Sequence, residues 1–377
     1  MDTLEPIPLS RPTFGDEEIE ALREVLDSGW VAGQGPRGRA LEEAFSALCG
    51  VASVAIANCT AALHLALLGF DVGPGDEVLV ADYTYPATGH SVLYTGATPR
   101  FVDVRPDTWT IDVDAAAAAI GPRTAGIVAV DTLGQCADLG PLGELAARHG
   151  LFLVEDAACS VGATYRGRPS GSLADVACFS LHARKGITSG EGGMLVSPDP
   201  ERVERARKLS CFGVESAHAR QSAGGLPVPV FEALGYNYKL SDVQAAIALV
   251  QLGRLPDLLA ARRRIAAAYL ERLADVPGLT LPVVGEERDH TWQTFALTLD
   301  PGVDRGAVAD ELRSAGVQVN IGTFASHVQP VYGPQDPLPV SAGLFARHLA
   351  IPMHANLTES DVDRVVAAVR ATLERHA

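Results

Sequence analysis

The segment Phe179-Ser180-Leu181-His182-Ala183-Arg184-Lys185-Gly186, followed by Gly190-Glu191-Gly192-Gly193, decides how this chain is interpreted. An earlier apolar run, residues 151–154, ends in Glu155-Asp156. Two patterns therefore occur in order: an apolar run that ends in an acid, and a later run that ends in Ser-x-His-x-x-Lys. In a chain of alternating strands and helices, this order indicates pyridoxal phosphate chemistry. Lys185 would hold the cofactor aldehyde as a Schiff base, Asp156 would face the pyridine nitrogen, and Ser180 would hold the phosphate.

Short apolar runs alternate with segments of helical period between about residues 50 and 200. The expected strands are residues 53–57, 77–81, 100–104, 126–130, 152–155, 176–180 and 194–196. The expected helices are residues 60–69, 87–94, 113–120 and 139–149. This alternation predicts an α/β fold with a mainly parallel seven-stranded sheet that helices cover on both faces.

The pattern changes after about residue 240. Residues 241–252 predict an amphipathic helix with Ser241 as its N-cap, and Pro256 breaks the pattern. The later elements are expected to be helices over 258–276, 305–315 and 359–375 and apolar runs over 294–299 and 317–321. We therefore expect a large cofactor-binding domain over residues 1–245 and a smaller α+β domain over residues 246–377.

Two segments carry less certain patterns. The helix over 258–276 has a cluster of arginines, Arg262, Arg263, Arg264 and Arg272, which we interpret as a solvated face. The Gly-, Pro- and Ala-rich segment 216–229 is too long for a simple connector, which indicates a functional loop.

Composition limits the class of partner. The formal net charge is −16, and no cluster of Lys and Arg interrupts it, which argues against a nucleic-acid partner. No leader segment and no apolar stretch of about 20 residues is visible, so we expect a cytoplasmic protein without a membrane partner. The six cysteines lack a C-x-x-C spacing, which favours reduced thiols over a zinc or disulfide framework. No metal site is expected.

Four features should meet at the carboxyl ends of the strands, where open α/β sheets collect their ligands. Thr60 lies at a helix N-terminus that could seat a phosphate dianion, and Tyr85 could stack on a flat heteroaromatic ring. Asp156 and Ser180 end two further strands. Taken singly, these residues fit an ordinary helix cap, a packing aromatic and two loop caps. Their convergence is what indicates a cofactor site.

Lys185 would then act as a base. Its amine must lose a proton before it attacks a carbonyl, which burial, a nearby cation or an existing Schiff base would favour. The released amine can carry a proton between an amino-acid carbon and the cofactor, which is the proton shift of transamination.

The chain resembles the DegT/StrS family of sugar aminotransferases, which are pyridoxal phosphate enzymes of fold type I. The similarity runs nearly end to end. The matching segments are Ile7-Pro8-Leu9-Ser10-Arg11-Pro12, Ser28-Gly29-Trp30, Thr60-Ala61-Ala62-Leu63-His64, Gly73-Pro74-Gly75-Asp76-Glu77-Val78, Gly96-Ala97-Thr98-Pro99, Glu155-Asp156-Ala157-Ala158, Ser180-Leu181-His182-Ala183-Arg184-Lys185, Gly190-Glu191-Gly192-Gly193-Met194, Tyr236-Asn237-Tyr238-Lys239-Leu240-Ser241 and His327-Val328-Gln329-Pro330.

The resemblance implies a homodimer with shared active sites, in which Asn237 reaches the phosphate of the partner subunit. It implies amino transfer from L-glutamate or glutamine, through pyridoxamine phosphate, to a keto-sugar nucleotide such as a dTDP-keto-6-deoxyhexose. That reaction belongs to amino-sugar and natural-product biosynthesis, including antibiotic biosynthesis. His327 and Lys239 are candidate cations for the anionic substrate.

Two positions depart from the family pattern. Cys159 stands beside the phenolic oxygen of the cofactor, where the family often has Gln or His, and Cys59 stands in Asn58-Cys59-Thr60 where Ser-Gly-Thr is usual. Lys185 is retained, whereas a dehydratase branch of the family has histidine there, so transamination is favoured.

Two alternatives remain open at this point. One is an aminotransferase for a keto-cyclitol or another secondary-metabolite ketone. The other is a sensor or regulatory protein that only binds pyridoxal phosphate. Retention of the catalytic-type residues argues against the sensor.

Overall fold

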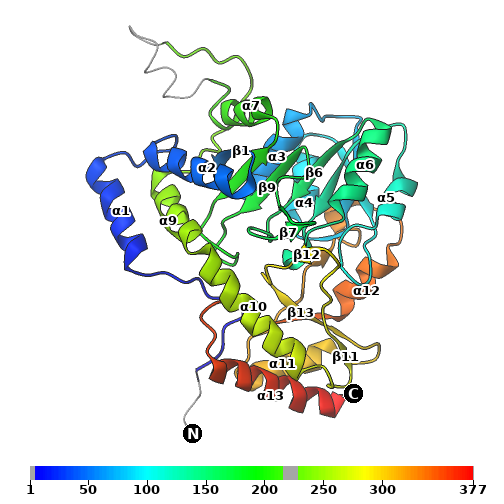
Figure 1. Cartoon of the computed structure of the whole chain (residues 1–377). Coiled ribbons are helices and arrows are strands. Elements are labelled where there is room, and N and C mark those ends of the chain that lie inside the picture. The colour runs from blue at the N-terminus through cyan, green and yellow to red at the C-terminus, as the bar shows by residue number, and fades with distance from the viewer. Residues whose placement is uncertain (1–4, 215–227, 377) are drawn as a thin grey trace.

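The computed structural model describes residues 5–214 and 228–376 and contains a central sheet between helical layers, with a smaller unit at one end (Figure 1). The predicted functional loop over 216–229 lies almost entirely outside the described residues.

The central sheet has seven strands in the order β1-β10-β9-β6-β5-β2-β4. Their bounds are β1 Ala52–Ile56, β2 Glu77–Ala81, β4 Thr98–Val102, β5 Thr124–Val130, β6 Phe152–Asp156, β9 Val176–Ser180 and β10 Gly193–Ser197. The strands from β9 to β4 run parallel, and only β10 runs antiparallel to its two neighbours, which confirms the mainly parallel seven-stranded sheet. Strand β4 starts before the predicted residue 100 and includes Pro99, which a sheet edge tolerates because one side of an edge strand needs no N–H donor.

Both faces of this sheet are buried, and this explains why its strands are apolar almost throughout. On β2, Val78 and Val80 pack into one core, whereas Leu79 and Ala81 pack into another on the opposite face. The first core includes α3 Cys59–Gly69, α4 Ala87–Tyr94 and α7 Pro200–Ser210. The opposite face is covered by α2 Pro36–Cys49, α5 Val113–Ala119, α6 Leu139–His149 and α9 Asp242–Gly253, with α1 Asp16–Ser28 beside α9.

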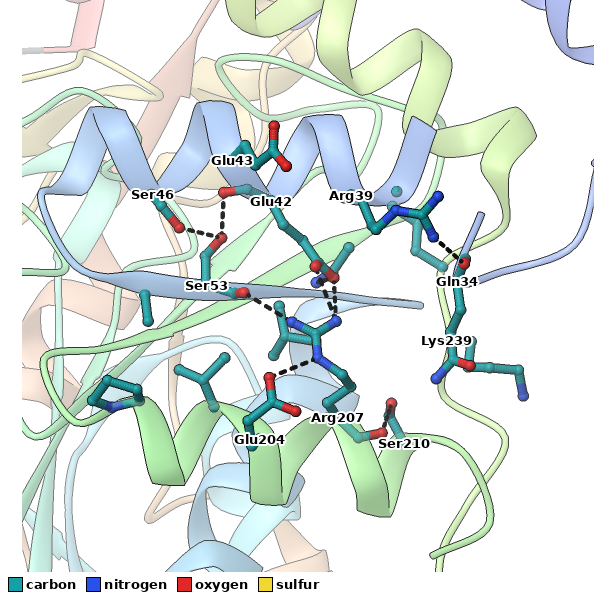
Figure 2. A pocket seen from close by; sticks show the side chains of 17 residues that line it. Gln34, Arg39, Glu42, Glu43, Ser46, Ser53, Glu204, Arg207, Ser210 and Lys239 are labelled. Carbon is teal, nitrogen blue, oxygen red and sulfur yellow. Dashed lines mark hydrogen bonds and ion pairs between the residues drawn. The ribbon is translucent and has the colours of Figure 1, made fainter. Parts of the chain in front are cut away.

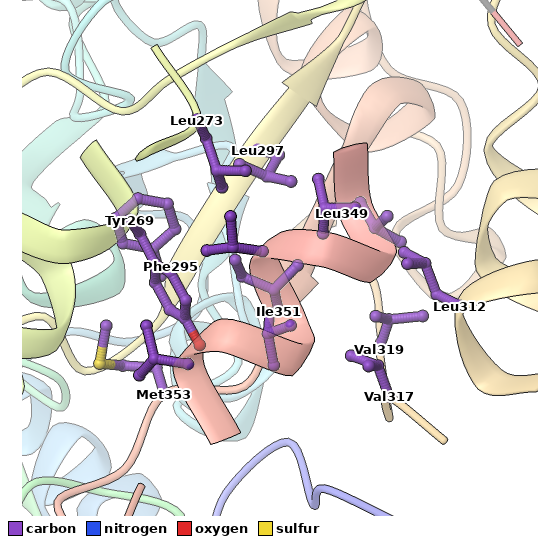
Figure 3. Packing of buried hydrophobic residues seen from close by; sticks show 14 of the residues in the cluster. Tyr269, Leu273, Phe295, Leu297, Leu312, Val317, Val319, Leu349, Ile351 and Met353 are labelled. Atoms are coloured by element: carbon purple, nitrogen blue, oxygen red, sulfur yellow. The ribbon is translucent and has the colours of Figure 1, made fainter. Parts of the chain in front are cut away.

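The smaller unit packs helices against a short antiparallel sheet, β11-β13-β15. Its elements are α10 Leu255–Arg272, β11 Leu279–Thr280, β13 Phe295–Leu299, α11 Arg305–Ser314, α12 Pro339–Arg347, β15 His348–Ile351 and α13 Glu359–His376. Tyr269, Phe295 and Ile351 lie at the centre of its core (Figure 3). The predicted apolar run over 317–321 contributes Val317 and Val319 to this core without forming a strand.

Short elements complete the fold. They are β3 Tyr83–Thr84 with β14 Phe324–Ala325, β7 Thr164–Tyr165 with β8 Arg168–Pro169 and β12 Arg288–Asp289, and the 3-10 turns Thr132–Gly134 and Pro330–Tyr332.

Helix α10 joins the two units. Its first turn includes Pro256, which the start of a helix accommodates, and α9 and α10 meet at an angle of 59°. Leu258 and Leu259 pack against the large sheet, whereas Ile265 and Tyr269 belong to the core of the smaller unit. The change of core therefore occurs within α10, and the boundary at residue 245 remains a proposal.

The interpretation of the α10 arginines as a solvated face is wrong for Arg262. Arg263 and Arg264 are exposed, but only 4% of the Arg262 side chain is accessible. Arg262 precedes Ile265 and Ala266 by three and four residues, so it lies on the buried stripe of the helix.

Within the described residues, no single helix is both long and apolar enough to cross a bilayer. Helices α9 and α10 meet those criteria only when they are taken together as a bent pair.

The free edge of β1 is covered by side chains (Figure 2). Glu42 on α2 accepts the Ala55 N–H at 3.0 Å, and Arg207 on α7 donates to the Ser53 carbonyl at 3.4 Å. Arg207 also donates to both Glu42 oxygens at 2.9 Å. This ion pair satisfies backbone groups that another strand could otherwise use, and it forms one wall of a pocket of about 550 Å³.

Glu42→Ala should lower the free energy of unfolding by about 2 kcal/mol, because Arg207 loses its anion and the Ala55 N–H loses its acceptor. Urea unfolding measures this loss. The control is Glu20→Ala, which breaks an exposed ion pair with Arg23 and should cost less than about 1 kcal/mol. Equal losses in the two variants would contradict a role in covering the strand.

Candidate active site

A cavity of about 830 Å³ lies at the carboxyl ends of the parallel strands. The structure brings seven sequence-predicted residues to its wall: Cys59, Thr60, Tyr85, Asp156, Cys159, Ser180 and Lys185. They come from the start of α3, the segment after β3, the ends of β6 and β9 and the loops that follow these two strands. Residues of the smaller unit, such as Asn320, Thr323 and Met353, line the same cavity. The cavity therefore lies between the large sheet and the smaller unit.

Asp156 presents a buried carboxylate to this cavity. Its Oδ2 accepts a hydrogen bond from the Thr88 hydroxyl at 2.7 Å, and its Oδ1 accepts from the Ala158 N–H at 3.2 Å. Burial raises the pKa of Asp156, which Thr88 and Ala158 oppose. A cation placed at this carboxylate would therefore restore the ionised form. Thr88 was not predicted, because a hydroxyl in a helical segment carries no distinguishing sequence signal.

The Lys185 amine is partly exposed to the cavity and donates to Cys159 Sγ at 3.1 Å. Burial lowers the pKa of Lys185, but Cys159, Cys59 and Asp156 outweigh burial and raise it overall. The expectation that burial would favour the neutral amine is therefore not met by the protein groups alone. The hydrogen-bonding thiol is the largest opposing influence.

The start of α3 offers free donors. Asn58, rather than Thr60, is the N-cap, and its side chain accepts the Ala61 N–H at 2.8 Å, so the helix begins at Cys59. Within the described residues the Thr60 N–H has no hydrogen-bond acceptor. The Ser180 hydroxyl accepts the His182 N–H at 3.3 Å and keeps its own proton to donate. Backbone and hydroxyl donors at a helix N-terminus suit a phosphate.

Cys59 is closed in beneath these donors. Its thiol lies 3.5 Å from the Cys178 carbonyl, and burial raises the pKa of Cys59 well above its usual range. The residue therefore packs as a small apolar side chain.

Arg262 lies behind the Lys185 loop. Its guanidinium donates to the Lys185 carbonyl at 3.4 Å and to the carbonyls of Trp292, Gln293 and Met353 at 3.1, 3.3 and 3.1 Å. Burial lowers the pKa of Arg262 to about 10. Sequence reasoning missed this residue, although its place in the apolar period of α10 was a usable signal.

Three predicted residues, His327, Asn237 and Lys239, do not line the cavity of this chain. His327 is held by Asp82, whose carboxylate lies 2.7 Å from His327 Nδ1 and accepts the His327 N–H. Asn237 is exposed, and its side-chain oxygen accepts a hydrogen bond from Lys239. Arg184 does line the cavity, and its guanidinium has no acceptor or ion-pair partner in the described part of the chain.

Comparison with known proteins places the chain among aminotransferases. Residues 12–370 match the DegT/DnrJ/EryC1/StrS aminotransferase family. The spore coat polysaccharide biosynthesis protein SpsC of Bacillus subtilis (strain 168) is 37% identical, with 97% of this chain and 96% of that protein covered.

Two solved structures are similar over nearly their whole length. DesV of S. venezuelae, in complex with a ketimine intermediate, is 34% identical with a TM-score of 0.91, and 99% of this chain and 100% of that chain are covered. The sugar aminotransferase CalS13 of Micromonospora echinospora is 31% identical with a TM-score of 0.89, covering 97% of this chain and 99% of that chain. The fold is therefore that of the fold-type-I pyridoxal phosphate enzymes.

Arg262→Ala should lower the free energy of unfolding by about 3 kcal/mol, because several buried carbonyls lose their donor at once. Chemical denaturation of the purified protein measures the change. Arg263→Ala makes the same substitution on the exposed side of α10 and should change stability by less than about 0.5 kcal/mol. A loss for Arg262→Ala no larger than for this control would refute the assigned contacts.

Proposed function

The chain belongs to the DegT/DnrJ/EryC1/StrS family of pyridoxal phosphate-dependent aminotransferases, and we propose that it transfers an amino group from L-glutamate or glutamine to a keto-sugar nucleotide. The observation that carries the proposal is the meeting of the Lys185 amine, the buried Asp156 carboxylate and the Thr60 and Ser180 donors around one cavity. The polysaccharide role named for SpsC and the sugar aminotransferase activity named for CalS13 support a sugar acceptor.

The side chains of the cavity fit pyridoxal phosphate. Asp156 would pair with the ring nitrogen, Thr60 and Ser180 with the phosphate, and Cys159 with the phenolic oxygen. Tyr85, which is 59% exposed beside Phe324, would cover the ring. When bound, the cofactor supplies an electron sink for the carbon atom that bears the amino group.

Lys185 performs the proton transfers in this proposal. Its amine would hold the cofactor covalently and, when free, would carry a proton to and from the reacting carbon in both halves of a ping-pong reaction. Arg262 fixes the main chain of Lys185 through its carbonyl. The Asp156 carboxylate would pair with the protonated ring nitrogen of the bound cofactor and would so support its electron sink.

Anionic substrates need a cation in the cavity. His327 is engaged by Asp82, so Arg184 is the better placed candidate for a substrate carboxylate or phosphate. Lys239 lies beside the exposed Asn237, outside the cavity of its own chain.

We propose a homodimer in which Asn237 of one subunit reaches the phosphate site of the other. The exposure of Asn237 supports this, and so do the exposed apolar side chains of Val230, Phe231 and Leu234 that precede it. A keto-cyclitol acceptor and a sensor role remain alternatives. The cytoplasmic location, the absence of membrane and nucleic-acid partners, and a role in antibiotic biosynthesis also remain proposals.

L-Glutamate should convert the visible absorption band of the pyridoxal phosphate-loaded protein into the near-ultraviolet band of the amine form. Lys185→Ala should slow this conversion by about 10³-fold or more, because the proton carrier is lost. Absorption spectroscopy measures both.

Lys208→Ala, on α7 and outside the cavity, should leave the conversion rate unchanged. A Lys185→Ala protein that converts at the wild-type rate would exclude the proposed role, and a wild type whose cofactor band L-glutamate leaves unchanged would favour the non-enzyme alternative. A panel of keto-sugar nucleotides and keto-cyclitols against the amine form then identifies the acceptor.

Mixed dimers test the shared site. Lys185→Ala and Asn237→Asp subunits should each be inactive alone, but a mixed dimer contains one site with both native residues. Co-expression should therefore restore roughly a quarter of wild-type activity if the subunits associate at random. Activity assays of the unseparated mixture give this value, and the purified mixed dimer should show about half of wild-type activity, because one of its two sites is native. No recovery in a mixed dimer of native size would show that Asn237 serves its own chain.

A further inference from the structure

Two carboxyl groups that the proposed reaction does not use are buried together at the edge of the cavity, whose lining includes Asp131. Asp131 follows β5 and Glu155 lies within β6, and their side chains are 1% and 0% accessible. Both lie beside Asp156, because Glu155 precedes it in the chain and the Asp131 N–H donates to the Asp156 carbonyl at 3.0 Å. Two such groups in mutual contact, away from water, cannot both ionise at low cost.

Asp131 is surrounded by hydrogen-bond donors. Its Oδ1 accepts the Ala137 N–H at 2.9 Å. Its Oδ2 accepts the Ser160 hydroxyl at 2.6 Å and lies 3.2 Å from the Ser170 hydroxyl. Burial raises the pKa of Asp131 as well, but these donors oppose that shift and favour its ionised form, so we assign the charge of the pair to Asp131.

Glu155 has a different environment. Its Oε2 accepts the Gly171 N–H at 3.0 Å, and its Oε1 lies 2.8 Å from the Ser170 hydroxyl. Since Ser170 can donate its single proton towards Asp131 or towards the neighbouring Ser160 at 2.8 Å, its oxygen is free to accept a proton from Glu155. Burial raises the pKa of Glu155 well above its usual range, and the Asp131 carboxylate raises it further.

We propose that Glu155 and Asp131 share one proton, held on Glu155, and that this hydrogen-bonded pair is a positioning unit for Asp156 and for the turn that bears Cys159. Ser160 connects the two parts, because it donates to Asp131 and its N–H closes the turn on the Ala157 carbonyl at 3.0 Å. A second negative charge on Glu155 would repel the Asp131 carboxylate and oppose ionisation of Asp156.

A metal ion is the alternative for this cluster, because Asp131, Cys136 and Glu155 lie close enough to ligate one. The carboxylate oxygens, however, already face N–H and O–H groups, and burial raises the pKa of the Cys136 thiol well above its usual range. The geometry therefore fits a proton better than a cation.

The titratable and charged groups near Glu155 could also make the stability of the protein depend on pH. They are the Asp131 carboxyl, the Cys136 and Cys178 thiols and the Cys49 thiol on α2, and Arg288 acts on Cys136. Burial raises the pKa of each thiol, so these thiols stay neutral as Glu155 titrates.

Glu155→Gln tests the proposal, because the amide reproduces a protonated acid that donates to Ser170 and accepts from Gly171. A carboxyl whose native pKa is raised stabilises the fold fully below its unfolded value, here about 4.5, and loses that contribution as pH rises through the native value. The wild-type protein should therefore become less stable relative to Glu155→Gln above this pH. The ratio of their unfolding equilibrium constants should change by up to about tenfold per pH unit.

Denaturant unfolding of the cofactor-free proteins between about pH 5 and pH 9 measures this ratio. Glu144→Gln on the exposed side of α6 is the matched control and should track the wild type at every pH. A pH-independent ratio for Glu155→Gln would overturn the proposal. Because this measurement needs no catalysis, it stands even if L-glutamate gives no reaction and the proposed function fails.

Asp131→Asn locates the proton. If Glu155 holds it, Glu155→Gln should bind pyridoxal phosphate within about threefold of the wild type, as absorbance titration reports, whereas Asp131→Asn and Glu155→Ala should bind it at least about tenfold more weakly. If Asp131→Asn binds pyridoxal phosphate as the wild type does and Glu155→Gln binds it more weakly, the proton is on Asp131. That result would contradict the assignment. Circular dichroism verifies that each variant is folded.

Discussion

The guanidinium of Arg262 connects the active-site loop that bears Lys185 to two segments of the smaller unit. Its four carbonyl acceptors belong to the loop after β9, the segment before β13 and the segment after β15. A buried cation without an acid partner is costly, and its Nε has no acceptor in the described residues, so the carbonyl contacts must offset most of that cost. The geometry that fixes Lys185 is therefore inseparable from the packing of the smaller unit against the sheet.

The acids at the strand ends lie in a low-dielectric region. Asp131 and Glu155 are buried together and Asp156 is buried next to Glu155 in the chain, so three negative charges there would be costly. A proton on Glu155 removes one of these charges and leaves Asp156 as the acid that acts in the cavity. The same reasoning explains why hydroxyls of Thr88, Ser160 and Ser170 surround these acids, since each can turn its proton towards whichever oxygen is charged.

Sequence patterns predicted the sheet and the strand-end residues because both depend on local chemistry. A strand buried on both faces is apolar throughout, and residues that end parallel strands must meet at one edge. The contacts that depend on packing were not visible. His327 could not be assigned to Asp82, nor Glu155 to Asp131, because residues far apart in the chain come together only when helices and strands pack. The apolar period of α10 could have predicted that Arg262 is buried. The cluster of arginines around it instead favoured the wrong interpretation of a solvated face.

Cys159 gives the Lys185 amine a neighbour whose chemistry differs from that of an amide or an imidazole. A carboxamide or imidazole at this place would present N–H donors, whereas the thiol accepts a hydrogen bond from Lys185 and donates only weakly. A carboxylate at the same distance would hold the amine in its charged form throughout. A thiol is a weaker hydrogen-bond acceptor than a carboxylate, so it binds the amine less strongly. The amine at the centre of the site therefore has a sulfur atom as its hydrogen-bond acceptor.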